Sequence, residues 1–282
     1  MRVNSSLDNF FSKTLPEGGL SRITDAVFSA YGYDFRDYHP ASASRRIALV
    51  MKSMKITDID QFIARLIADR LVLQAMLESL SINVTAMFRD PVVYKFLREQ
   101  VLPRLATYPH IRIWSAGVAG GAEAYSLAIM LKEAGLYERS LIYATDFNAA
   151  VLKQAQHGVF ALRDMAKYTQ NYIEAGGTES FSNYYTTTPH LAHIDPSLKE
   201  RIIFSTHNLA TDGGFNEFHL IMCRNVMIYF NAKLTERALQ MFNESLVHFG
   251  YLCLGTKENL KFQHAAQFFE PVTHRLKVYK KV

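Results

Sequence analysis

The sequence is poor in cysteine and has no long apolar run. Only Cys223 and Cys253 occur among 282 residues, and both lie inside apolar, strand-like stretches. This excludes a disulfide framework and favours a reduced compartment. No uninterrupted apolar run approaches the roughly 20 residues that a membrane helix needs. Residues 1–13 lack the apolar centre of a secretory signal, so we expect a cytoplasmic protein.

Several catalytic motifs are also absent. None of the ten histidines stands at zinc-ligand spacing with a full set of partners. His190 and His193 are close together, but no cysteine or carboxylate pair accompanies them. The sequence has no Gly-x-Ser-x-Gly elbow and no phosphate-binding loop that ends in Gly-Lys-Ser or Gly-Lys-Thr. We therefore expect no metal site, no serine hydrolase of that class and no P-loop nucleotide hydrolase.

The composition is that of an ordinary globular protein, with 49% apolar residues, 20% charged residues and a net charge of +5. The clearest cluster of one charge sign is basic and comprises Arg45, Arg46, Lys52 and Lys55. Such a cluster is either a solvated helix face or a docking surface for an acidic partner. No basic stripe interleaved with aromatic residues is present, so nucleic-acid binding is not favoured.

The chain divides near residues 80–90. Residues 20–80 show helical periodicity and little else, with apolar stripes that predict a series of short helices. Thr57 or Asp58 is suited to cap one of these helices at its start. We predict a small all-helical N-terminal domain over residues 1–82.

Residues 83–282 alternate between strand and helix signals. Strands are predicted at 111–116, 141–144, 201–206, 218–223 and 250–255, and helices at 122–134, 148–157 and 232–248. This alternation predicts an α/β domain with a mostly parallel, doubly wound sheet. Residues 163–200 break the rhythm, since they are rich in Tyr, Thr, Asn and Gly. We expect them to form a small strand insertion on the sheet scaffold.

The most informative segment is 111–125, where an apolar strand enters a glycine-rich turn that opens directly into a helix. Such a turn lets a ligand approach bare backbone and points the helix N-terminus at it. The next strand ends at Asp146, where an open α/β sheet holds the hydroxyls of an adenosine ribose. The segment predicts a nucleoside-containing cofactor. The spacing Gly117-x-x-Gly120-Gly121 differs from the dinucleotide fingerprint, which counts against a nicotinamide cofactor.

Three candidate residues also have a simpler structural explanation. Asp146 can cap the following helix, and Glu123 can compensate the dipole of its own helix. Arg224 can form a structural salt bridge. However, Arg224 and Asn225 directly follow a buried strand, and polar groups at the carboxyl end of a central strand lie at the binding crevice.

A set of short motifs runs along the chain: Asn83-Val-Thr-Ala-Met-Phe-Arg89, Trp114-Ser-Ala-Gly117, Glu123-Ala-Tyr125-Ser-Leu-Ala128, Ala144-Thr-Asp146, Asn208-Leu209 and Cys223-Arg-Asn-Val-Met-Ile-Tyr-Phe230. Together they resemble the CheR-type methyltransferases of bacterial chemotaxis. The resemblance extends from about residue 15 to residue 280. It implies a Rossmann-like domain that binds S-adenosylmethionine, a small helical N-terminal domain and an inserted β-subdomain.

The resemblance also implies an activity. Such enzymes transfer a methyl group from S-adenosylmethionine to glutamate side chains of chemoreceptors and release S-adenosylhomocysteine. The basic cluster would then meet an acidic helical surface of the receptor's cytoplasmic part, and only the receptor would link the protein to the membrane. The cofactor pocket implied by the resemblance comprises Asn83, Thr85, Arg89, Glu123, Asp146, Asn208, Leu209, Arg224 and Asn225. Arg89 and Tyr229 would lie nearest the transferred methyl group.

The implied chemistry agrees with the residues available, because a glutamate carboxylate is already ionised near neutral pH and needs no general base. One departure from the family pattern stands out. Where the family reads Gly-Glu-Glu-Pro-Tyr, this chain has Gly121-Ala-Glu-Ala-Tyr125, and one carboxylate is lost at Ala122. Two alternatives therefore stay open. One is a signalling module that binds S-adenosylmethionine with weakened activity, and the other is a different nucleotide-binding enzyme.

Overall fold

The computed structural model describes residues 15–81, 85–261 and 263–282. The chain forms two compact units. The first comprises Met1–Ile82, Leu209–Asp212 and Tyr229–Ala238, and the second comprises Asn83–Asn208, Gly213–Ile228 and Leu239–Val282. The first is called the helical unit below and the second the α/β unit.

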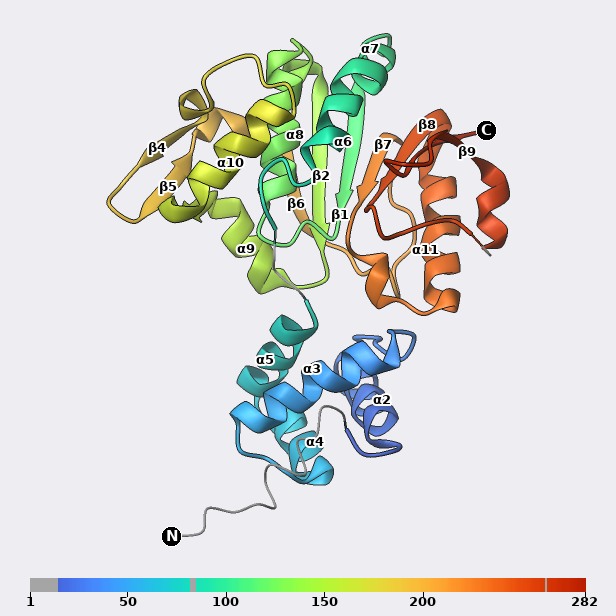
Figure 1. The fold of residues 1–282 in the computed structure, drawn as a ribbon. Coiled ribbons are helices and arrows are strands. Elements are labelled where there is room, and N and C mark those ends of the chain that lie inside the picture. Colours follow the sequence, from blue (N-terminus) through green and yellow to red (C-terminus); the bar gives the residue numbers. More distant parts are fainter. Residues whose placement is uncertain (1–14, 82–84, 262) are drawn as a thin grey trace. The chain divides into compact units, whose positions relative to one another are not determined.

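The helical unit is built on four helices: α2 (Gly19–Tyr31), α3 (Pro40–Ser53), α4 (Ile59–Ala68) and α5 (Arg70–Leu80) (Figure 1). Asp58 caps α4, since its side chain accepts a hydrogen bond of 2.7 Å from the backbone N–H of Gln61. Phe28, Leu49 and Ile67 of the apolar stripes are exposed, whereas most stripe residues face inward and form the core. Its fully buried members include Ile23, Ile47, Met51, Phe62, Leu66 and Met76. The predicted N-terminal helical domain is confirmed. Helix α3 begins at Pro40, a residue well suited to a first helical turn.

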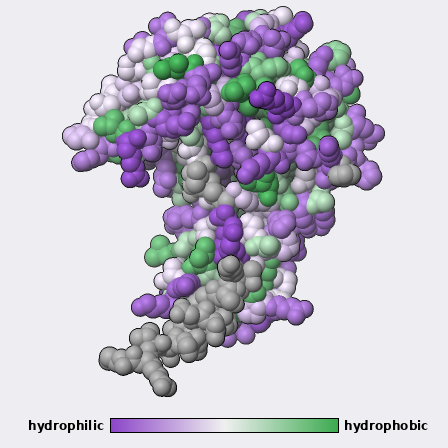
Figure 2. Space-filling view, in the orientation of Figure 1, coloured by the Kyte–Doolittle hydropathy of each residue, from purple (hydrophilic) through white to green (hydrophobic). Residues whose placement is uncertain are grey.

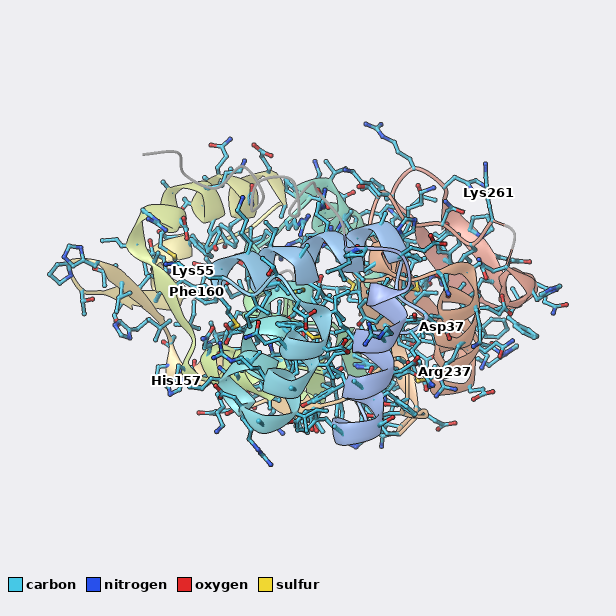
Figure 3. All side chains as sticks on the ribbon, turned by 90° about the horizontal axis from the view of Figure 1, so that it is seen from below. Asp37, Lys55, His157, Phe160, Arg237 and Lys261 are labelled. Carbon is cyan, nitrogen blue, oxygen red and sulfur yellow. The ribbon has the colours of Figure 1, made fainter. Side chains whose placement is uncertain are left out.

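A second segment of the chain completes the helical unit. The backbone N–H of His39 donates to the carbonyl of Tyr229 over 2.7 Å, and Tyr38 forms an isolated antiparallel bridge with Phe230. Asp37, labelled in Figure 3, accepts a hydrogen bond from the Asn231 side chain and forms an ion pair of 2.8 Å with Lys233. The loop before α3 therefore binds a segment about 190 residues away in the sequence.

The α/β unit contains a seven-stranded sheet in the order β6-β2-β1-β7-β8-β10-β9 (Figure 1). The strands are β1 (Ile111–Ala116), β2 (Ser140–Asp146), β6 (Ile202–Thr206), β7 (Phe218–Cys223), β8 (Leu246–Leu254), β9 (Phe269–Thr273) and β10 (Val278–Lys281). The first five pair in parallel, whereas β10 pairs antiparallel with both β8 and β9. The predicted doubly wound sheet is confirmed, and its last two strands had no strong signal in the sequence.

Helices cover both faces of this sheet. On one face lie α6 (Pro91–Phe96), α7 (Leu102–Leu105), α8 (Ala122–Glu133) and α9 (Ala149–His157), which enclose the main apolar core. On the other face Phe242 of α11 (Ala232–Ser245) packs against Trp114, with ring centroids 5.4 Å apart. The Trp114 indole N–H also donates to the Thr145 hydroxyl over 2.8 Å, so β1 and β2 are joined by a side-chain bond as well as by backbone pairing.

The insertion lies between α9 and β6. It carries helix α10 (Leu162–Glu174) and a three-stranded antiparallel sheet in the order β3 (Val159–Ala161), β5 (Leu191–Ile194), β4 (Tyr185–Thr187). A small strand subdomain was predicted and is confirmed, while α10 is an addition to it. Buried Glu133 of α8 ties the insertion to the scaffold. It accepts hydrogen bonds from the hydroxyls of Tyr172 and Tyr184.

Figure 2 shows a surface that is mainly hydrophilic on the side in view, with small and separate hydrophobic patches. Among the residues that the structure describes, no helix combines the length and apolar character needed to cross a bilayer.

Candidate active site

The predicted site residues of the α/β unit gather at the carboxyl ends of β1, β2 and β7. In the sheet order, β1 has β2 on one side and β7 on the other. The chain therefore reverses its direction of winding at β1, and this reversal opens a crevice beyond the strand ends in sheets of this kind. Glu123 lies in the first turn of α8 after β1, Asp146 is the last residue of β2, and Arg224 directly follows β7.

The glycine turn after β1 is held against both neighbouring loops. The backbone N–H groups of Gly117 and Val118 donate to the carbonyl of Thr145 over 2.8 and 2.9 Å. Gly117 has φ +77°, and a Cβ at this position would lie 2.4 Å from a methyl group of Val226. A Cβ at Gly120 would lie 3.5 Å from a methyl group of Thr85, which is an ordinary van der Waals contact. Gly117 is thus required for packing, whereas the backbone at Gly120 is open to a ligand.

Asp146 lies at the end of β2 and binds the glycine turn with one carboxylate oxygen and the segment after β2 with the other. Oδ2 accepts from the backbone N–H of Ala119 over 3.1 Å, and Oδ1 accepts from that of Asn148 over 3.0 Å. Burial raises the pKa of the Asp146 carboxyl above its ordinary value, while these backbone N–H groups act in the opposite direction. The helix cap is supplied by Asn148, whose side chain accepts from the N–H groups of Ala150 and Val151. The capping explanation for Asp146 therefore fails, and its remaining acceptor capacity is available to a ligand.

Glu123 and Arg224 form the centre of a buried polar network. Glu123 Oε1 accepts a hydrogen bond of 2.7 Å from the Ser115 hydroxyl, and its Oε2 lies 3.5 Å from Nη1 of Arg224. Burial raises the pKa of the Glu123 carboxyl, against the effects of Arg224 and Ser115. Arg224, with only 2% of its side chain exposed, also pairs with Asp90 over 2.7 Å. The salt-bridge explanation for Arg224 is thus correct. Arg224, which directly follows β7, also orients the Glu123 carboxylate.

Arg89 lies in a short loop that Arg224 also holds. Nη2 of Arg224 donates to the Arg89 carbonyl over 2.9 Å. The residues on either side of Arg89 both have positive φ, +51° at Phe88 and +59° at Asp90. Such backbone is costly for residues other than glycine and is concentrated at functional sites. The network therefore fixes the backbone from which the Arg89 side chain projects.

Glu258 is a member of this site that the sequence analysis missed. Its carboxylate is buried and accepts hydrogen bonds from the backbone N–H groups of Asn225, Val226 and Gly255, at 3.0, 2.9 and 2.5 Å. These bonds fix the turn at Asn225, whose φ is +61°. The buried Asn225 Oδ1 has no hydrogen-bond partner among the described residues. The turn therefore presents a free acceptor, as a ligand site would.

The remaining predicted pocket residues are placed as follows. Asn83 lies outside the described residues, and Thr85 contacts the glycine turn as stated above. Asn208 follows His207, whose backbone N–H donates to the carbonyl of Asp146 over 3.1 Å. Leu209 and Tyr229 belong to the helical unit, and their place beside a cofactor stays a prediction.

The basic cluster of the helical unit is not uniform. Arg45, Lys52 and Lys55 are exposed, and Lys55 lies just beyond the end of α3 (Figure 3). Arg46 is half-buried, donates to the Ser79 carbonyl over 2.9 Å and lies over the Tyr229 ring at 5.5 Å. Arg46 is thus committed to structural contacts. Leu49, 58% exposed, lies between Arg45 and Lys52 on the same helical face.

No group of three or more His, Cys, Asp or Glu side chains is arranged to hold a metal ion within residues 15–81, 85–261 and 263–282. The polar centre of the site consists instead of a buried carboxylate–guanidinium pair, a second carboxylate and open glycine backbone. This donor set is suited to a ligand with hydroxyl and amine groups.

Comparison with known proteins identifies the family. Residues 83–276 match the profile of the CheR methyltransferase, SAM binding domain, and residues 19–81 match that of the CheR methyltransferase, all-alpha domain. The chain belongs to the CheR methyltransferase family. It is 41% identical over 259 residues to a protein of Pseudomonas putida named "Putative methyltransferase Cher3", and the match covers 92% of this chain and 95% of that protein.

Two further CheR relatives are named chemotaxis protein methyltransferase. The protein of Listeria innocua is 33% identical over 239 residues, covering 84% of this chain and 88% of the relative. The protein of Salmonella typhimurium is 29% identical over 258 residues, covering 87% and 85%. The CheR chain described here is therefore an S-adenosylmethionine-dependent methyltransferase. Its site fits that cofactor through the open backbone at Gly120, the spare acceptors of Asp146 and the unpartnered Asn225 Oδ1.

Proposed function

We propose that this protein methylates glutamate side chains of chemoreceptors in the cytoplasm. Products would be glutamyl methyl esters and S-adenosylhomocysteine. The observation that carries the proposal is the loop around Arg89, whose carbonyl is held by Arg224. The carboxylates described in the site, Glu123, Asp146 and Glu258, already accept hydrogen bonds from the protein, and none of them is assigned as a general base. Methyl transfer to a carboxylate needs no such base, because the carboxylate is already ionised at neutral pH.

The bound cofactor supplies an electrophilic methyl group on a sulfonium centre. The protein's own task is alignment, which can lower a barrier by several kcal/mol. A guanidinium such as that of Arg89 can bind the acceptor carboxylate through two N–H groups and direct one oxygen forward. Tyr229 is proposed to share this orienting role.

The arrangement of the loops supports the following proposed cofactor contacts. Asp146 accepts hydrogen bonds from the ribose hydroxyls, since its carboxylate retains acceptor capacity beyond its bonds with the backbone N–H groups of Ala119, Phe147 and Asn148. Glu123 and Asn225 face the charged amino acid portion. The proposed pocket also includes Asn83, Thr85, Arg89, Asn208, Leu209 and Arg224, as the family resemblance implies.

The receptor is proposed to dock on α3 of the helical unit. Arg45, Leu49 and Lys52 recur at helical spacing and are exposed, so they present a basic face with one apolar contact. Lys55 extends this face beyond the helix end. An acidic helical surface is complementary to it.

A second candidate, a binding module with weakened activity, is favoured by one observation. Ala122 is fully buried at the start of α8, at a position where the family usually carries a carboxylate. A methyl-transfer assay on receptor-bearing membranes, with radiolabelled S-adenosylmethionine, separates the two candidates. Label in receptor glutamates that is released by mild base, as from a methyl ester, supports the enzyme. Calorimetric binding of the cofactor without such label supports the module.

A further inference from the structure

The loop that carries Arg89 is held at three consecutive residues by side chains from three different elements. The Met87 carbonyl accepts from the Asn171 amide over 3.0 Å. The Phe88 N–H donates to the Ser126 hydroxyl over 2.9 Å, and the Arg89 carbonyl accepts from Arg224. Ser126 is on α8 and Arg224 follows β7, so two of these anchors belong to the methyltransferase scaffold.

The third anchor belongs to the insertion. Asn171 lies on α10, is buried, and reaches Met87 across 84 positions of sequence. Helix α10 packs beside α6, which begins directly after the loop (Figure 1). A buried side-chain amide that donates a hydrogen bond to a loop carbonyl indicates that the position of that loop is specifically constrained.

The insertion also holds the ring of Phe88. Its centroid lies 5.3 Å from that of Tyr172 and 6.2 Å from that of Phe181, both in the insertion, and 5.2 Å from that of Tyr94 on α6. The ring is fully buried. A backbone with positive φ at a residue with a large side chain persists only where its surroundings over-determine it, and these aromatic rings supply much of that constraint.

We propose that the insertion positions the active site, with Asn171 as a positioning residue for Arg89. By fixing the Met87 carbonyl, Asn171 sets the direction in which the Arg89 side chain leaves the loop. The proposal rests on the proposed role of Arg89 toward the acceptor carboxylate. A change in the packing of α10 is therefore passed to the Arg89 side chain through the Met87 carbonyl.

The test replaces Asn171 with leucine, which has the same number and branching of side-chain heavy atoms and lacks the N–H donor. Gln170→Leu is the matched control, because Gln170 is exposed on the same helix and its amide donates to Glu174 within that helix. We expect Asn171→Leu to lower kcat by about 10-fold to 100-fold, as misplacement of a reacting group does. The affinity for S-adenosylhomocysteine, measured by calorimetry, should fall much less than kcat, because Arg89 is only one of the proposed pocket residues. Asn171→Gln retains an amide donor and should recover part of kcat.

Hydrogen exchange gives a readout that does not depend on activity. The peptide that contains residues 85–90 should exchange faster in Asn171→Leu than in the wild type, and at the wild-type rate in Gln170→Leu. If the wild type methylated no receptor, the proposed function would fail, yet the exchange result would still decide whether α10 holds the loop. Unchanged exchange, or a loss of cofactor affinity as large as the loss of kcat, would overturn the positioning role.

Discussion

Asp146 and Ala119 are joined by a hydrogen bond of 3.1 Å from the backbone N–H of Ala119 to Oδ2 of Asp146. The bond ties the end of β2 to the turn after β1, and it leaves the carboxylate with further acceptor positions toward the crevice. The same side chain thus shapes the pocket and is proposed to bind the ribose.

Asp146→Asn should weaken S-adenosylhomocysteine binding by about 10-fold to 100-fold. The amide has one acceptor oxygen in place of two, and hydrogen bonds to a charged group are worth about 1.5–3 kcal/mol. Isothermal calorimetry measures the effect. Asp164→Asn, a similar change at a half-exposed position of α10, should leave the affinity unchanged. Equal loss in both variants would contradict a local role for Asp146.

The pH dependence of binding and of stability should have opposite signs at this residue. Ribose hydroxyls donate to the ionised carboxylate, so the affinity for S-adenosylhomocysteine should fall as pH falls through the raised pKa of Asp146. Because that pKa is higher in the folded protein than in the unfolded chain, the folded state binds the proton more tightly. The contribution of Asp146 to stability should therefore decrease as pH rises from its unfolded to its folded pKa. The difference in unfolding free energy between the wild type and Asp146→Asn, measured against pH, isolates this contribution.

Much of this site could be predicted because its signals are local in sequence. The glycine turn, the strand before it and Asp146 after the next strand follow rules of spacing in parallel α/β sheets. Glu258 and Asn171 could not be predicted in this way. They act across 33 and 84 positions, and an isolated Glu or Asn carries no sign of its distant backbone partner.

The fold shows the same division. The parallel strands were predicted from apolar runs that alternate with helices. Strands β9 and β10 were not, since the segment FEPVT of β9 contains a proline and lies at the sheet edge, where burial imposes little pattern. The joining of residues 229–238 to the helical unit depends on Asp37 and Tyr38 contacts that no periodicity reveals.

Gly117→Ala should destabilise the α/β unit by more than an ordinary glycine replacement at positive φ. A methyl group there would lie 2.4 Å from Val226, in addition to the backbone cost of about 1–2 kcal/mol. Gly135→Ala is the matched control, because Gly135 also has positive φ and a Cβ there has no described atom within 4 Å. Thermal unfolding of the two single variants and of the double variant Gly117→Ala/Val226→Ala separates the steric cost from the backbone cost. If Val226→Ala gave no recovery, the steric explanation would be wrong.

Arg45→Glu should lower receptor methylation while the affinity for S-adenosylhomocysteine stays unchanged. The exposed guanidinium of Arg45 is proposed to meet an acidic receptor surface, and charge reversal there mainly slows association. The loss should shrink as ionic strength rises, because salt screens exposed charges. The double reversal of Arg45 and Arg46 should lower methylation further but also lower the melting temperature, since Arg46 donates to the Ser79 carbonyl. Equal loss of methylation and of cofactor binding in Arg45→Glu would count against a docking role.

Glu258→Gln should destabilise the turn at Asn225 and weaken cofactor binding together. Three backbone N–H groups converge on the Glu258 carboxylate, and glutamine offers one oxygen and a competing N–H₂ group. At least one buried N–H loses its acceptor, at a cost of about 1–3 kcal/mol. Glu270→Gln on edge strand β9 is an exposed control that should unfold at the wild-type temperature. Burial raises the pKa of the Glu258 carboxyl, so burial itself disfavours the charged form. We therefore attribute the greater stability of the wild type over Glu258→Gln to the hydrogen bonds of the carboxylate. Lower thermal stability with full retention of S-adenosylhomocysteine affinity would show that Glu258 supports the fold but does not shape the cofactor site.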